Sequence, residues 1–153
     1  MTVIDSLYDW LKTCSLFEEK RLDIDCLQSD SNHYSLDAVP CERIVKRYLD
    51  GSSVRRQLFT ISSRAPFGPD ITIQSENLQF FDDLESWLEE QAERGLLPDL
   101  GENRRARSLT VLSSGYPVEA DEGQGGGTAR YQIQLELIYL QNALNISTGG
   151  NPK

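Results

Sequence analysis

The chain has 153 residues, which is enough for one domain with a single hydrophobic core. Its 15 Lys and Arg residues against 24 Asp and Glu residues give a net charge of −9, and the calculated isoelectric point is about 4.6. This acidic balance argues against a protein that wraps duplex DNA or docks on an anionic membrane surface, because both kinds of binding depend on clustered positive charge.

The N-terminal part of the chain predicts one helix and two strands. Residues 3–14 carry apolar side chains at three- and four-residue steps, which is typical of an amphipathic helix, and Thr2 is in position to cap it. Residues 22–27 and 34–39 alternate between apolar and polar types. Each therefore favours a strand with one face toward the core.

A reverse turn is predicted at residues 50–53. This Asp-Gly-Ser-Ser segment separates two strand-like stretches, 43–49 and 54–62, and Asp-Gly favours the positive φ angles of tight turns. The pattern predicts a β-hairpin. Residues 64–72 contain two prolines and a glycine, and we expect them to form a loop.

The longest helix is predicted over residues 76–94, with Ser75 as the N-cap and Gly95 just past the C-terminus. One face is apolar and is expected to pack on the sheet; it comprises Leu78, Phe81, Leu84, Trp87, Leu88 and Gln91/Ala92. The opposite face is acidic and is expected to be solvated; it comprises Asp82, Asp83, Glu85, Glu89, Glu90 and Glu93.

Two further strands are predicted at residues 107–113 and 129–140. They are expected to pair as a long hairpin across the Gly-rich segment 121–128. In the second strand one face is apolar; it comprises Tyr131, Ile133, Leu135, Leu137 and Tyr139. Gly115 and Pro117 favour a bend or an edge position in the first of the two strands.

Together these elements predict an α+β fold, with a mainly antiparallel β-sheet and two helices packed on it. One domain is expected over residues 1–144, followed by a flexible tail at 145–153. No apolar run approaches the ~18–20 residues that cross a bilayer. The N-terminus lacks a basic segment followed by an apolar one, so we expect no signal peptide.

The sequence offers few groups for catalysis or metal binding. Its one histidine, His33, follows a polar stretch, and we expect a solvated loop side chain rather than a catalytic base. The three cysteines, Cys14, Cys26 and Cys41, lack the close spacing of structural zinc ligands and make no disulfide framework, which favours the reducing cytosol. We therefore predict no catalytic residue, no metal site and no cofactor.

Basic and acidic residues are separated along the chain. Residues 43–64 contain six Lys or Arg residues and one Asp, and residues 104–107 contain three Arg, whereas the outer face of the 76–94 helix is acidic. One interpretation is that basic and acidic surfaces pair between copies, head to tail, in a ring. The alternative is that the charges serve solubility alone. The candidates for a subunit interface are Arg55, Arg56, Arg104, Arg105 and Arg107.

Four stretches of the chain resemble a family of small phage and prophage proteins. They are IDSLYDWLK (4–12), SLDAVPCERIVKRYLDGSSVRRQLF (35–59), DLESWLEEQAERGLLPDL (83–100) and TARYQIQLELIYLQ (128–141). These minor structural, or "minor capsid", proteins are encoded among the head–tail joining genes of long-tailed phages that infect Gram-positive bacteria. The resemblance covers about residues 3–141, and the general plan is also similar to tail-terminator, or tail-completion, proteins.

The resemblance implies a non-enzymatic virion protein with a tail-terminator-like fold. Such subunits form a hexameric ring that caps the tail tube and meets the head connector. The implied partners are further copies of the chain, the tail tube protein and the head connector or stopper protein, with DNA only as passing cargo and no membrane. The implied locations are the virion and, during assembly, the bacterial host cytoplasm. The free subunit can be a monomer before it meets these partners.

In that architecture a flexible hairpin loop commonly becomes ordered on assembly. Here the candidates are the glycines of the 121–128 segment: Gly123, Gly125, Gly126 and Gly127. The segment lacks the Lys-Ser/Thr pair and the following helix that a phosphate-binding loop requires, so we do not expect it to bind a nucleotide.

Two other functions stay open at the level of sequence. One is a small cytosolic enzyme, transferase-like, that uses His33 or Cys41. The other is a regulatory or interaction module on a generic α+β scaffold.

Overall fold

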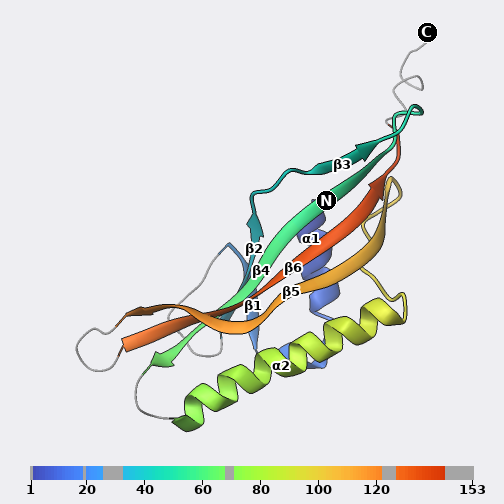
Figure 1. Cartoon of the computed structure of the whole chain (residues 1–153). Helices are drawn as coiled ribbons and strands as arrows, with labels where there is room; N and C mark the ends of the chain where they lie inside the picture. The colour runs from blue at the N-terminus through green and yellow to red at the C-terminus, as the bar shows by residue number, and fades with distance from the viewer. Residues whose placement is uncertain (1, 19, 26–32, 68–70, 122–126, 144–153) are drawn as a thin grey trace.

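The computed structural model describes residues 2–18, 20–25, 33–67, 71–121 and 127–143. Two α-helices and six strands make up this part of the chain, with one 3₁₀ turn (Figure 1). In chain order they are α1 (Val3–Leu11), η1 (Ser15–Phe17), β1 (Arg21–Ile24), β2 (His33–Val39), β3 (Ile44–Arg47), β4 (Ser53–Phe67), α2 (Ile71–Glu93), β5 (Arg104–Asp121) and β6 (Gly127–Gln141).

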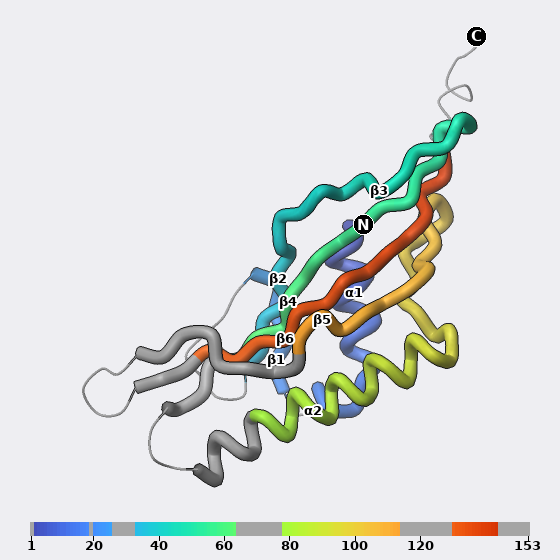
Figure 2. The backbone as a smooth tube through the Cα atoms, in the orientation of Figure 1, coloured from blue at the N-terminus to red at the C-terminus, as the bar shows by residue number. Residues whose placement is uncertain are grey.

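The six strands form one sheet in the order β1-β2-β4-β6-β5, and β3 pairs with the beginning of β4. All neighbours are antiparallel except β1 and β2. The long strands β4, β5 and β6 run side by side along the length of the molecule (Figure 2). The fold is therefore α+β, as predicted, and both predicted hairpins, β3–β4 and β5–β6, are present.

Both α-helices pack on the same face of the sheet, and no helix of the described residues covers the other face. Leu7 and Leu11 of α1 share one hydrophobic cluster with Phe81, Leu84 and Leu88 of α2. The strands contribute alternate residues to this cluster, among them Leu36, Phe59, Ile61, Tyr131, Ile133, Leu135, Leu137 and Tyr139. The predicted inward face of residues 129–140 is confirmed, because a strand directs every second side chain to the same side. We call the face without a helix the open face.

The first helix is capped as predicted. The hydroxyl of Thr2 accepts a hydrogen bond from the amide of Asp5 at 3.0 Å, and the Asp5 carboxylate accepts one from the Thr2 amide at 3.0 Å. This reciprocal pair satisfies two amides that the first helical turn leaves free. The helix ends at Leu11, three residues before the prediction. Its last turn tightens, because the amides of Thr13 and Cys14 bond to carbonyls three residues earlier.

The second helix begins earlier than the sequence predicts. It starts at Ile71, so Ser75 lies inside the helix and is not its N-cap. The predicted loop at 64–72 is wrong for the same region, because β4 extends to Phe67 in register with β6. Leu78, which the sequence predicts to face the sheet, is exposed. Phe80, which is not part of that predicted face, packs against the ring of Tyr34.

The end of α2 follows the prediction. Gly95 has a φ of +71°, and the amides of Gly95 and Leu96 bond to the carbonyls of Ala92 and Gln91. These two bonds form a Schellman motif, which needs a left-handed residue just past the helix.

The fifth strand is longer than predicted and lies at the edge of the sheet. It covers Arg104–Asp121 rather than 107–113, and Gly115 and Pro117 fall inside it, which agrees with their predicted edge position. Its pairing with β6 shifts register at four places. Bulges and a proline on an edge strand hinder pairing with a further strand.

Some predictions fall on residues that the structure does not describe. They concern the polar stretch 28–32, Cys26, residues 68–70 of the predicted loop, the loop glycines Gly123, Gly125 and Gly126, and the whole predicted tail, 145–153. Of the loop glycines, Gly127 is described and is the first residue of β6. Within the described chain, neither α-helix combines the length and the apolar character that a bilayer crossing demands.

Candidate functional site

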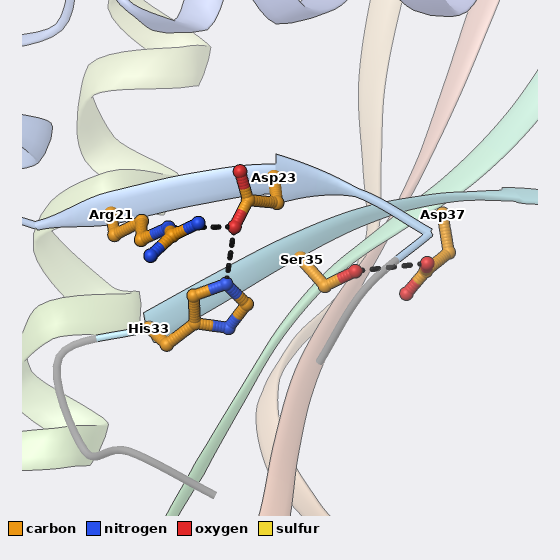
Figure 3. Close-up of polar contacts among 5 residues, drawn as sticks. All are labelled: Arg21, Asp23, His33, Ser35 and Asp37. Carbon is orange, nitrogen blue, oxygen red and sulfur yellow. Dashed lines mark hydrogen bonds and ion pairs between the residues drawn. The ribbon is translucent and has the colours of Figure 1, made fainter. Parts of the chain in front are cut away.

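A row of polar side chains lies on the open face at β1 and β2 (Figure 3). The parallel register places Arg21 beside His33 and Asp23 beside Ser35. The residues between them in sequence are buried in the core; they are Leu22, Tyr34 and Leu36. Because side chains alternate along a strand, Arg21, Asp23, His33, Ser35 and Asp37 all belong to the open face.

His33 is not the solvated loop residue that the sequence predicts. It is the first residue of β2 and is 1% exposed. Its Nε2 lies 2.6 Å from Oδ2 of Asp23, and the same oxygen accepts a hydrogen bond from Nε of Arg21 at 2.9 Å. The hydrogen bond with His33 holds the pKa of Asp23 below its usual value, and the charge of Arg21 acts in the same direction. The prediction fails because pairing with β1 brings a carboxylate to the imidazole.

A second polar group surrounds Asp37. Its carboxylate accepts hydrogen bonds from the hydroxyls of Ser35 at 2.9 Å and Ser62 at 3.5 Å. It also lies 3.6 Å from the guanidinium of Arg130. Burial raises the pKa of Asp37, and the neighbouring Asp25 carboxylate also raises it. The group thus connects β2, β4 and β6 across the open face.

These contacts connect neighbouring strands. The hydroxyl of Ser35 donates a hydrogen bond to the carboxylate of Asp37, on the same strand. Cys41 follows the far end of β2, and the six steps along the strand from His33 to Val39 alone span roughly 20 Å at about 3.3 Å per residue. His33 and Cys41 therefore do not meet in one site. In the part of the chain described, no three His, Cys, Asp or Glu side chains are placed together to hold a metal ion.

The described cysteines behave as packing residues. Cys14 is 1% exposed, and burial raises the pKa of its thiol. This environment keeps the thiol in its less reactive, protonated form. Cys41 is half-buried and makes one long contact, 3.9 Å from its sulfur to the carbonyl of Arg56.

The five predicted interface arginines lie at one end of the sheet. The last residues of β6 separate the two groups: Val54 pairs with Leu140, and Leu140 pairs on its other side with Arg105. Two segments about fifty residues apart in sequence are thus two strands apart in space. Arg105 and Arg107 are exposed, and Arg104 is half-buried.

Arg55 and Arg56 do not act as one patch, because neighbouring residues of a strand face opposite sides. Arg55 pairs with Tyr139 on the helix-covered face and donates from Nε to the Ser53 hydroxyl at 3.0 Å. Arg56 lies on the open face, with Nε 3.0 Å from the carboxylate of Glu136. The charge of Arg56 is therefore matched inside its own chain, and that of Arg55 is not matched by an ion pair among the described residues.

The acidic face of α2 is exposed as predicted, and it borders a groove that the sequence does not reveal. The groove lies between α2 and β5 and has a volume of about 330 Å³. It is lined by Glu89, Ala92, Glu93, Leu109, Thr110 and Val111. Its walls come from segments that are distant in sequence, so only the packing of α2 on β5 creates it.

The tip of the β3–β4 hairpin carries exposed apolar side chains. Leu49 is fully exposed, Val45 is 50% exposed and Tyr48 is 39% exposed. The turn is well hydrogen-bonded: the Tyr48 amide donates to the Ser52 carbonyl at 2.9 Å, and Gly51 has a φ of +92°. The Asp-Gly signal located this turn, but we did not single out its apolar residues from the sequence.

A larger cleft, of about 470 Å³, lies where the α2–β5 connection meets the end of β6. Arg104 and Arg105 are among the residues that line it, together with Asp99 and Glu102. Two of the five predicted interface arginines therefore border a hollow of mixed charge.

Comparison with known proteins gives no functional assignment. No family model matches the chain, and no curated protein matches its sequence. One solved structure is similar over 87% of this chain and 88% of its own, with 12% sequence identity and a TM-score of 0.44. That protein carries a sequence label in place of a functional name, and a likeness of this degree carries no argument about function.

Proposed function

We propose that this chain is a non-enzymatic structural subunit of a phage virion at the head–tail junction. As a tail-terminator or tail-completion protein, it assembles with copies of itself into a ring that caps the tail tube and joins it to the head connector. The resemblance over residues 3–141 motivates the proposal. The observation that carries it is the separation of surface features: the outer face of α2 is acidic, whereas the β3–β4 hairpin and the start of β5 are basic and partly apolar.

Such a surface favours head-to-tail contacts. A surface that is basic in one region and acidic in another is complementary to a second copy that is rotated relative to it. Contacts between two different regions of the same chain produce a ring when the rotation closes. Exposed apolar residues such as Leu49 and Leu112, which is 49% exposed, add area that a partner covers.

The edges of the sheet favour contacts through side chains rather than added strands. β1 has four residues and carries Arg21 and Asp23, and β5 has irregular pairing and contains Pro117. Short, charged or bulged edge strands resist pairing with a further strand. Association by the faces and the hairpin tip is therefore the route that this sheet leaves open.

The charge of the chain is compatible with a channel for DNA. With a net charge of −9, a ring of several copies is strongly acidic and repels phosphate, so DNA can pass without being held. In this proposal the tail tube protein and the connector or stopper protein are the partners, and the protein acts in the host cytoplasm and in the virion.

Negative-stain electron microscopy tests the proposal directly. Purified full-length protein is mixed with tails that lack a terminator, and rings at the tail ends are counted against tails alone. We expect rings of uniform size on the tube ends. A protein that stays monomeric and never associates with tubes or connectors contradicts the proposal.

The alternative of a small transferase-like enzyme rests on the His33–Asp23 pair. That pair is joined to Arg21, and Cys41 lies beyond the other end of β2. The residues expected to serve such an enzyme are thus apart, and the observations favour the structural role.

A further inference from the structure

We propose that the tip of the β3–β4 hairpin of one copy docks in the groove between α2 and β5 of the next copy. This contact rests on the proposed function, because it is the contact that builds the ring. It assigns a role to two features that the prediction of interface arginines leaves out: the apolar hairpin tip and the apolar floor of the groove.

The tip combines apolar and positive side chains. Leu49 is fully exposed, with Val45 and Tyr48 beside it in the hairpin. Lys46 and Arg47 are exposed, and the ammonium of Lys46 lies 5.2 Å from the centre of the Tyr48 ring. A bulge between Ile44 and Lys46 interrupts the pairing of β3. A leucine held fully in water at the end of an ordered turn gains by burial against a partner.

The groove combines an apolar floor with a negative rim. Leu109 is buried, Ala92 and Val111 are half-buried, and Glu89 and Glu93 are exposed at the edge. Among the described residues, neither glutamate forms an ion pair inside the chain. The volume of about 330 Å³ exceeds the ~150 Å³ that suffices for a benzene-sized group, so it accommodates a leucine side chain.

The two features match in chemistry and cannot meet within one chain. Lys46 and Arg47 are opposite in charge to Glu89 and Glu93. Leu49 is apolar, as is the floor of the groove. The groove residue Leu109 pairs with Leu137, and Leu137 pairs with Gln57 on β4. The four steps along β4 from Ser53 to Gln57 span roughly 13 Å, and the hairpin continues away from the groove beyond Ser53. The occupant is therefore a second copy, and tip and groove are different surfaces, as a ring requires.

Charge reversal with rescue tests the contact. One full-length variant carries Lys46→Glu and Arg47→Glu at the tip, and a second carries Glu89→Lys and Glu93→Lys at the groove. We expect each variant alone to associate at least about tenfold more weakly than the wild-type chain in sedimentation velocity and to cap few tails in electron microscopy. Mixed in equal amounts, the two should assemble, because every tip then finds a groove of opposite sign.

Matched controls separate this contact from general charge effects and from misfolding. Asp82→Lys with Asp83→Lys makes the same change in charge on α2, outside the groove, and is expected to associate as the wild-type chain does. Leu49→Ser is expected to abolish assembly, whereas Leu78→Ser, at a leucine that is 42% exposed on α2, is not. Rescue by mixing shows that both reversed variants are folded.

The outcomes distinguish this contact from the ring itself. If the tip variant and the groove variant each form rings as well as the wild-type chain does, the docking contact is overturned and the proposed function still stands. Loss of capping by the tip variant with normal self-association of both variants shows that the tip binds the tail tube, which also overturns it. A wild-type chain that neither self-associates nor caps tails overturns both proposals.

Discussion

At the scale of single residues, the open face contains two carboxylates that respond to pH in opposite ways. Asp23 lies in contact with a histidine and an arginine, and its pKa is lowered. Asp37 is more enclosed and lies near Asp25, and its pKa is raised. Asp23 lies on β1 beside Ser35 of β2, and Asp37 is two residues further along β2. The same pair of strands therefore favours the charged form of Asp23 and disfavours the charged form of Asp37.

Replacing Asp23 by Asn is expected to lower the free energy of unfolding at neutral pH. In acid this difference from the wild-type chain is expected to disappear. The folded pKa of Asp23 lies below the ordinary value of 3.8, so its contribution is present above that value and disappears as the pH falls through the folded pKa. Urea unfolding of both chains across this range measures the difference. A difference that grows as the solution is acidified contradicts the assignment.

Replacing Asp37 by Asn is expected to show the opposite trend. The folded pKa of Asp37 is raised, so the group favours folding below its unfolded pKa, and this contribution is lost as the pH rises through the folded pKa. The free energy of unfolding of the Asn variant, measured relative to the wild-type chain, should therefore increase from acid to neutral pH. The same series of urea titrations checks it, with the Asp23 variant as a control of opposite sign.

At the scale of elements, local signals located the start of α1 and the end of α2, but not the ends of the long strands. The capping box at Thr2 and the glycine at Gly95 are satisfied within a few residues of sequence, so their patterns predict them directly. The ends of β4 and β5 depend on how far β6 continues beside them. That information lies elsewhere in the chain, and both strands exceed their predicted lengths.

Replacing Gly95 by Ala tests the importance of the α2 terminus. Gly95 has a φ of +71°, and an added Cβ meets nothing within 4 Å. The cost of the substitution therefore comes from the backbone conformation and not from a steric clash. We expect a loss of about 1 kcal/mol in the free energy of unfolding. Gly95→Asn should cost less, because asparagine enters the left-handed region more readily. Equal stability of all three chains in chemical denaturation argues against a left-handed terminus.

At the scale of the whole molecule, the sheet brings together charges that the sequence separates. Arg55 and the arginines of 104–107 lie on either side of the last residues of β6. The helices cover one face, and the outer surface of α2 remains acidic. This distribution is the basis of the contact that we propose between copies.

Reversing Arg105 and Arg107 to Glu is expected to weaken ring assembly, most clearly at low ionic strength, because exposed charges are screened within about 10 Å at 0.1 M salt. Reversing Arg55 should have a similar effect on the salt dependence. Sedimentation velocity at several salt concentrations measures both. If assembly is unaffected, these residues lie outside the interface.

Arg56→Glu serves as the contrasting variant. Arg56 already pairs with Glu136, so its reversal brings two carboxylates together inside one chain. The expected result is a lower midpoint of thermal unfolding in the isolated subunit. A normal midpoint with defective assembly instead places Arg56 in the interface.

By itself, the sequence determined the α+β class, the order of the two α-helices and six strands along the chain, the inward face of the last strand and the glycine that ends α2. These features follow from periodicity and from contacts within a few residues, both of which are written locally in the chain. It also showed that acidic and basic residues are segregated.

Only the tertiary structure decided the environment of His33, the separation of Arg55 from Arg56 and the groove beside α2. Each depends on pairing between segments distant in sequence: β1 with β2 buries the histidine, and α2 on β5 forms the groove. The strand register also determines which side each residue faces, and a shift of one position reverses it. Such pairings are not encoded in any single stretch, so the surface that we propose as the contact between copies forms only when the sheet is complete.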